Sequence, residues 1–154
     1  MKPEEIKPDT ELCTILGYNA QTGKCRKYFN KCLKENKLNA TGIALNIKED
    51  HFEYIMKNLA ESKVKKMIIE HEFSENIVHF CDVLDECAKA KKSVDFLEVV
   101  EGKINGYCLD DAIDEYIENP DFVDENIRLA MKMMLLSKRW YGAKVEMDLV
   151  PTMI

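Results

Sequence analysis

The segment Gly17–Lys24 (GYNAQTGK) has the residue types of a phosphate-binding loop. It follows an apolar run and precedes a segment with helical periodicity, which is the setting of such loops. The spacing differs, however, because five residues separate the two glycines where a nucleotide-binding loop has four, and Cys25 stands where Ser or Thr would bind magnesium. A helix that starts with Lys24, Arg26 and Lys27 could still bind a small anion through its free N–H groups. A solvated basic first turn is the commoner explanation of such a segment.

The thiol of Cys25 shares this electropositive segment, which would lower its pKa if the side chain were exposed. Cys25 also falls on an apolar stripe with Phe29 and Cys32, where it would be an inert small hydrophobe, and we expect this core position. None of the six cysteines forms a C-x-x-C pair, so a zinc site or a redox dithiol is not indicated. We expect reduced thiols in a cytoplasmic protein.

His71-Glu72 could begin a zinc-protease motif, but the next histidine, His79, comes eight positions later instead of four. His71, His79 and Cys81 could meet at a metal only through loop geometry, so we expect no metal site. His71 follows an apolar run that reads as a strand. It is therefore interpreted as a pocket-edge or loop residue, because parallel sheets bind ligands beyond the carboxyl ends of their strands.

Carboxylates gather in Asp110-Asp111 with Asp114 and Glu115. On a short helix these residues usually form a solvated face. Asp110 comes soon after a strand-like run that ends at Tyr107, so its side chain could instead point into a cleft.

The elements that would position these residues alternate between strand and helix. Short apolar or alternating runs predict strands at 12–16, 41–47 and 64–69 and a hairpin at 93–100 and 103–107. Helical periodicity predicts helices at 22–36, from a cap at Asp50 to Ala60, from a cap at Ser74 to Ala88, at 109–117, and from a cap at Asp121 to Tyr141, where Gly142 ends it. This order predicts a three-layer α/β/α sandwich. Its sheet has five or six mostly parallel strands with one antiparallel strand, and a long helix follows at the C-terminal end.

Length and composition limit the number of domains and the possible classes of protein. The 154 residues suffice for one domain, which we place at 11–154 after a flexible N-terminal segment 1–10. The net charge of −6 argues against a nucleic-acid footprint, no apolar run approaches the ~20 residues of a membrane span, and the start lacks the apolar core of a signal peptide. The last helix is apolar nearly all round, which predicts partial burial together with a homodimer contact through Met131, Met133, Met134, Leu135 and Leu136.

The order of elements resembles the substrate-binding (N-terminal) domain of shikimate dehydrogenase. The best match is Gly102-Lys103-Ile104-Asn105-Gly106-Tyr107-Cys108-Leu109-Asp110, which is similar to the family's Gly-Lys-Leu-x-Gly-Tyr-Asn-Thr-Asp. It places Asp110 at the family's catalytic aspartate. Upstream, Val94-Asp95-Phe96 stands for Val-Asn-Thr, Gly17 matches the glycine that ends the first strand, and Asn30 falls on the family's asparagine. The segment from Met133 to Gly142 resembles the family's C-terminal helix.

Other positions depart from the family. The two serines that bind the carboxylate of shikimate fall on Gly23 and Cys25, and the catalytic lysine falls on Ser74. The family's substrate-binding asparagine falls on Ile68 and its threonine on Glu70. The chain has no G-x-G-x-x-G fingerprint for a dinucleotide, so we expect no cofactor. The resemblance implies a Lys–Asp pair for proton transfer and NADP for the hydride, and this chain keeps only the aspartate. NADP-dependent catalysis by this chain alone is not expected.

These observations favour a non-catalytic module that binds a small ligand or a protein partner. The ligand-binding candidates converge on one cleft and are Gly23, Lys24, Cys25, Glu70, His71, Ser74, Asp95 and Asp110. The carboxylates among them favour a metabolite with an amine or hydroxyls over one with a carboxylate. Two alternatives stay open: an interaction or oligomerisation subunit that works with a separate enzyme, and an enzyme that uses His71, Glu70 and Asp110 as acid–base groups. No nucleic acid or membrane is expected as a partner.

Overall fold

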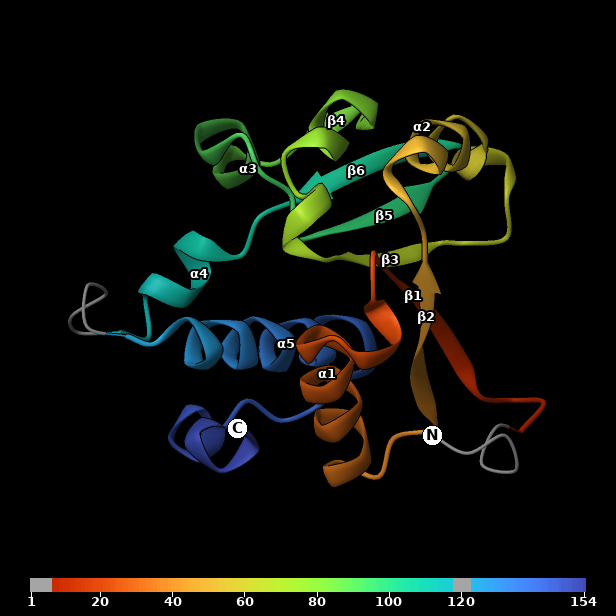
Figure 1. Ribbon diagram of the computed structural model, residues 1–154. Helices are drawn as coiled ribbons and strands as arrows, with labels where there is room; N and C mark the ends of the chain where they lie inside the picture. Colours follow the sequence, from red (N-terminus) through yellow and green to blue (C-terminus); the bar gives the residue numbers. More distant parts are fainter. Residues whose placement is uncertain (1–6, 118–122) are drawn as a thin grey trace.

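The computed structural model describes residues 7–117 and 123–154 and contains one six-stranded sheet with the order β2-β1-β3-β5-β6-β4 (Figure 1). β1 is parallel to β2 and β3, and β4 is parallel to β6, whereas β5 is antiparallel to both of its neighbours. The predicted, mostly parallel sheet with one reversed strand is confirmed. Its strands are β1 (Glu11–Gly17), β2 (Ala40–Asn46), β3 (Lys66–Ile69), β4 (Val83–Leu84), β5 (Phe96–Val100) and β6 (Lys103–Tyr107).

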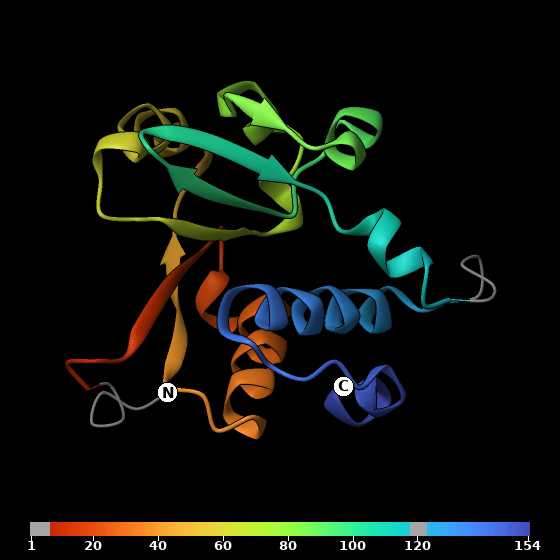
Figure 2. The same cartoon turned by 180° about the vertical axis from the view of Figure 1, so that it is seen from behind.

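Helices cover both faces of the sheet, as the alternation of strand and helix predicted (Figures 1 and 2). Side chains alternate along each strand, so that Ile15 joins the core on one face and Leu16 the core on the other. The first core contains residues of α1 (Lys24–Glu35) and α5 (Glu125–Tyr141), and the second contains residues of α2 (Glu49–Asn58) and α3 (Glu86–Lys91). This is the expected three-layer α/β/α arrangement.

The predicted hairpin between β5 and β6 is confirmed. Its tight turn places both Glu101 and Gly102 at positive φ, 53° and 76°. Two consecutive residues with positive φ are the signature of a type I′ turn, whose twist matches that of the paired strands.

The predicted helix from a cap at Ser74 to Ala88 is wrong. The chain instead forms a 3₁₀ turn, then the short strand β4, and then α3, whose N-cap is Asp85. The Ser74 hydroxyl donates to the carbonyl of His71 instead of capping a helix. The Asp82 carboxylate accepts from Ile104 N–H while the Asp82 N–H donates to Ile104 O. Pairing with β6 therefore overrides the helical pattern of the apolar residues.

Other element ends differ by a few residues. The N-cap of α2 is Lys48, and the expected cap Asp50 lies in the first turn. The expected helix at 109–117 is the shorter α4 (Asp110–Asp114). Asp121, the expected cap of the long helix, lies outside the described residues, and the cap is Asp124, which accepts from Asn126 N–H at 2.7 Å. Gly142, at φ 76°, ends this helix as predicted.

The apolar side of the long helix α5 is buried within the chain, whereas Lys138 and Arg139 are exposed. Met131, Met133, Met134 and Leu136 are all buried, between α1 and the 3₁₀ segment Met147–Met153, which the sequence did not predict. Partial burial was expected, but the methionines leave no exposed stripe for a dimer contact. No described helix is long and apolar enough to cross a membrane.

The buried methionines of α5 give the first prediction. Met133→Ala should lower the free energy of unfolding by about 2–5 kcal/mol, because Met133 is 1% exposed and truncation leaves a cavity. Chemical denaturation measures this, with Lys138→Ala on the exposed side of α5 as the control. A Met133→Ala variant as stable as that control would contradict the enclosed position.

Candidate functional site

The candidate site lies at the carboxyl edge of the parallel strands. Gly17 ends β1, Glu70 follows β3, and Asp110 lies just beyond β6. Because β5 runs in the opposite direction, Asp95, which precedes it, reaches the same edge. α1 begins at this edge as well, so its N-terminus joins the side chains that the strands deliver there (Figure 1).

Glu70 lies against the start of α1. A Cβ atom on Gly23, the N-cap residue, would be 2.6 Å from Glu70 Oε1, and a Cβ atom on Gly17 would be 2.6 Å from Glu70 Cγ. Both distances are shorter than real Cβ contacts, so a side chain at either position would require Glu70 to move, and the two glycines leave room for Glu70 where it lies. The chain thus supplies its own carboxylate to a helix N-terminus, the place where an anion is electrostatically favoured.

The Glu70 carboxylate is largely shielded from solvent. Glu70 is 9% exposed, and its Oε1 has no hydrogen-bond partner among the described residues. Burial raises the pKa of the Glu70 carboxyl, and the thiol and main-chain N–H of Cys25 only partly oppose this rise. Burial and then the negative charge of Glu70 raise the pKa of Cys25 well above its ordinary value. Cys25, 3% exposed, is the neutral core thiol that the sequence predicted.

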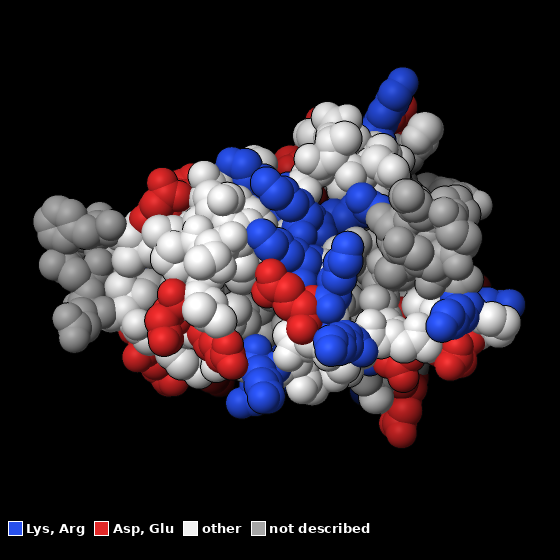
Figure 3. Space-filling model, turned by 90° about the horizontal axis from the view of Figure 1, so that it is seen from below, with Lys and Arg blue, Asp and Glu red and all other residues white. Residues whose placement is uncertain are grey.

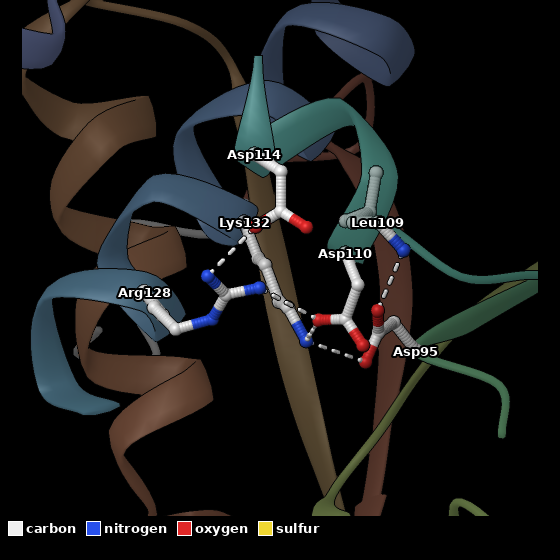
Figure 4. A network of polar contacts seen from close by, with 6 residues as sticks. All are labelled: Asp95, Leu109, Asp110, Asp114, Arg128 and Lys132. Atoms are coloured by element: carbon white, nitrogen blue, oxygen red, sulfur yellow. Dashed lines mark hydrogen bonds and ion pairs between the residues drawn. The ribbon is translucent and has the colours of Figure 1, made fainter. Parts of the chain in front are cut away.

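A second polar group joins the sheet edge to α5. Lys132 Nζ lies 2.7 Å from Asp110 Oδ1 and 3.2 Å from Asp95 Oδ1, and Figure 4 shows it reaching from α5 between the two carboxylates. Arg128, one turn earlier on α5, bridges Asp110 at 3.2 Å and Asp114 at 3.0 Å. The other oxygen of Asp95 accepts from Leu109 N–H at 2.7 Å.

These contacts fix the charges of the group. Although burial acts to raise the pKa of Asp110, its ion pairs with Lys132 and Arg128 hold that pKa below the ordinary value. Burial acts to lower the pKa of Lys132, but Asp95 and Asp110 outweigh it and raise that pKa. Asp110 is thus a carboxylate and Lys132 an ammonium across the whole physiological range.

Lys132 and Arg128 were missed at the sequence level. The available signal was their i, i+4 spacing, which puts two cations on one side of a helix that is otherwise largely apolar. That signal could have identified a polar stripe, but not the carboxylates that it meets.

The other predicted site residues are placed differently. Lys24 Nζ turns to Asn126 Oδ1 at 2.7 Å, and Ser74 bonds within its own turn. The His71 side chain is 94% exposed and lies 3.3 Å from Glu72. The structure therefore joins Gly23, Cys25 and Glu70 in one group and Asp95 and Asp110 in another.

Two sets of three side chains have the spacing of metal ligands, with ligand atoms within 4.8 Å of one another: Glu70, His71 and Glu72, and Asp95, Cys108 and Asp110. In the second set, the Lys132 ammonium already provides the positive charge that a metal would bring. In the first, His71 points into solvent. His79 and Cys81, the other residues considered for a metal, belong to neither set.

The ion pairs of Lys132 give the second prediction. Lys132→Met should lower the free energy of unfolding by about 3 kcal/mol at neutral pH, because it removes the cation that pairs with Asp95 and leaves Asp110 paired with Arg128. The ionised Asp110 contributes its full share of folding stability above its ordinary pKa of 3.8. This stability is lost as the pH falls through the lower pKa of the folded state. The charged Lys132 contributes its full share of folding stability below its ordinary pKa of 10.5. This stability is lost as the pH rises through the higher pKa of the folded state.

The free energy of unfolding of Lys132→Met, measured by denaturation from acid to alkaline pH, tests this pH range. Lys57→Met, at an exposed ion pair with Glu53, is the control. A loss of stability that is the same at pH 3 as at pH 7 would contradict the ion-pair explanation.

The burial of Glu70 gives the third prediction. Glu70→Gln should raise the stability of the protein at neutral pH, because the folded state disfavours the ionised carboxyl. With a raised folded pKa, the advantage of the protonated carboxyl is complete below 4.5 and is lost as the pH rises through the folded value. The difference between the variant and the wild type should therefore vanish in acid. Thermal unfolding across this pH range, with Glu75→Gln on the surface as the control, measures it; a less stable Gln variant at pH 7 contradicts it.

Comparisons with known proteins agree with this geometry. The family model of the shikimate dehydrogenase substrate binding domain matches residues 15–97. The NADP(+)-dependent shikimate dehydrogenase of Methanococcus maripaludis is 24% identical over 105 residues, which are 68% of this chain and 38% of that enzyme.

Solved structures share the fold at low identity. The shikimate dehydrogenase of Aquifex aeolicus has a TM-score of 0.63 at 19% identity, covering 85% of this chain and 54% of that one. The Listeria monocytogenes enzyme, solved with shikimate and NAD, has a TM-score of 0.62 at 14% identity. The match covers 72% of this chain and 38% of that one. The 5-ketofructose reductase of Gluconobacter sp. strain CHM43 has a TM-score of 0.61 at 13% identity. The match covers 84% of this chain and 51% of that one.

This chain thus spans between about a third and a little over half of the length of these relatives. The family model covers more than half of the chain, and the six-stranded sheet has the same fold as the solved enzymes. The chain belongs to the family of shikimate dehydrogenase substrate-binding domains.

Proposed function

We propose that this chain is a non-catalytic member of its family that binds a small ligand without a carboxylate group. The observation that carries the proposal is the position of Glu70 against the N-terminus of α1. In the alignment by resemblance, Gly23 and Cys25 stand where relatives have the serines that bind the carboxylate of shikimate. Here an internal carboxylate takes that place, and it would repel a second one.

The charges of Asp110 and Lys132 support the proposed absence of catalysis. A general acid–base group works best with a pKa near the working pH. Asp110 and Lys132 have pKa values moved in opposite directions, away from neutrality, by the ion pair that they share. The N-terminus of α1 does not fit NADP either, since the Glu70 carboxylate at its first turn would repel a pyrophosphate.

The ligand class follows from charge. Glu70, Asp95 and Asp110 place three carboxylates along one edge of the sheet. Among the described residues, Lys132 and Arg128 form the ion pairs with Asp95 and Asp110. Such an edge accepts hydrogen bonds from hydroxyl or ammonium groups. We therefore propose a polyol or an amine as the ligand, and a reducing compartment such as the cytoplasm as the location, in keeping with six free thiols.

A pair of ligands that differ only in charge gives the fourth prediction. Shikimate and its neutral methyl ester are compared by calorimetry on the wild type and on Glu70→Ala. The wild type should bind the ester at least tenfold more tightly than the acid, because Glu70 excludes the acid's carboxylate. Glu70→Ala should bind the acid more tightly than the wild type does, because it frees the N–H groups of α1. With shikimate and NADP, neither protein should form NADPH.

The surface variant Glu75→Ala is the control and should behave as the wild type does. Turnover of shikimate by the wild-type chain would overturn the non-catalytic assignment. Tighter binding of the acid than of the ester by the wild type would overturn the role given to Glu70.

A further inference from the structure

A hollow of about 520 Å³ lies at the start of β1, at the opposite edge of the sheet from the candidate site. It lies at a gap in the sheet. β1 pairs with β2 from Glu11 onward, whereas its pairing with β3 begins only at Thr14. Within the described part of the chain, no strand pairs with residues 11–13 on the β3 side. The volume of the hollow is within the range of small-molecule sites, about 300–1,000 Å³.

The floor of the hollow is apolar. Leu12 and Ile43 lie on the same side of the sheet, because Ile43 pairs with Thr14 and Leu12 is two residues earlier along β1. Their side chains are 53% and 40% exposed and belong to neither of the two cores. Val64 and Tyr141, which ends α5, line the hollow as well. Large apolar side chains that are exposed together in a hollow are typical of a binding site for an apolar group.

The rim of the hollow is positively charged. Lys63, Lys65 and Lys66 line it, and Glu11 is the one acidic residue among the described residues that do so. Among residues 7–117 and 123–154, none of these three lysines forms an ion pair. Lys66 Nζ lies over the ring of Tyr141, 4.8 Å from its centroid, and this cation–π contact holds it at the hollow. The rim therefore carries more positive than negative charge.

The surface at this end of the molecule has the same sign of charge. Figure 3, seen from the end where β1 and β2 begin, shows Lys and Arg side chains gathered in the middle of that face. The whole chain has a net charge of −6, so this end differs from the rest of the molecule. A local surplus of positive charge attracts anions, and salt weakens the attraction.

We propose that this hollow binds a free organic acid that has one carboxylate on an apolar chain or ring. The apolar part lies against Leu12 and Ile43, and the carboxylate lies among the lysines of the rim. Exposed charge pairs contribute little to affinity by themselves, so burial of the apolar part supplies the rest. The proposed function concerns the other edge of the sheet, where Glu70 excludes carboxylates, so the two ligand classes do not compete for one site.

Titration with octanoate and with octanamide tests this proposal and is the fifth prediction. The two probes have the same chain and head groups of similar shape, but only octanoate is charged. In two-dimensional NMR spectra of the ¹⁵N-labelled chain, both probes should shift the amide signals of Leu12, Ile43 and Val64, and the shifts should saturate. Octanoate should bind about fivefold more tightly at low ionic strength, because it pairs with the lysines, and added salt should reduce this difference.

Two variants separate the rim from the floor. Lys63→Glu with Lys65→Glu should weaken octanoate binding more than tenfold and leave octanamide binding unchanged, because repulsion replaces attraction at the rim. Ile43→Ser should weaken the binding of both probes, because it removes part of the apolar floor.

Lys89→Glu with Lys91→Glu on α3 is the control, because it makes the same change of charge at exposed lysines that do not line the hollow. The NMR spectra also show whether each variant is folded. The proposal is overturned if octanoate gives no saturable shifts at the hollow, if octanamide binds as tightly, or if neither variant weakens octanoate binding. Octanoate shifts at Gly23 and Cys25 would instead contradict the proposed function, so the two proposals can fail separately.

Discussion

The ion pairs of Lys132 hold the candidate site together. Asp95 comes from the start of β5, Asp110 from beyond β6, and Lys132 from α5, so one ammonium ties three separate segments to the same point. Without it, two carboxylates would face each other at a largely buried edge and repel. The same contacts that position Asp110 also hold its pKa below the ordinary value, so the arrangement ties these segments together and keeps Asp110 ionised.

The sequence predicted the fold where local pattern and tertiary packing agree. The run 12–16 became β1 because its apolar residues alternate between two helix layers, and Gly102 supplied the turn conformation that the hairpin needs. The prediction failed at 74–88, where a helical pattern of apolar residues was overridden by pairing between β4 and β6 and by the bonds of Asp82 to Ile104. Those bonds join residues more than twenty positions apart, and no local pattern encodes them.

The site was predictable to a similar, partial extent. Strand ends brought Glu70, Asp95 and Asp110 to one edge, as the parallel topology requires, but no local pattern indicated that Glu70 would lie against Gly23. Lys132 could not be predicted as a site residue, because its partners Asp110 and Asp95 lie 22 and 37 positions earlier in the chain. His71, interpreted as a pocket-edge or loop residue, turns its side chain into solvent, which the strand pattern before it did not indicate.

The departures from the family pattern are connected by sterics and charge. A side chain at position 23 would require the Glu70 carboxylate to move, because its Cβ would be 2.6 Å from Glu70 Oε1. The small size of Gly23 and the present position of the Glu70 carboxylate therefore fit together, and burial, which raises the pKa of Glu70, disfavours its ionised form. A buried, poorly hydrogen-bonded carboxylate that makes stability worse calls for an explanation other than stability. Excluding a carboxylate ligand from the N-terminus of α1 is the function that we propose for this position.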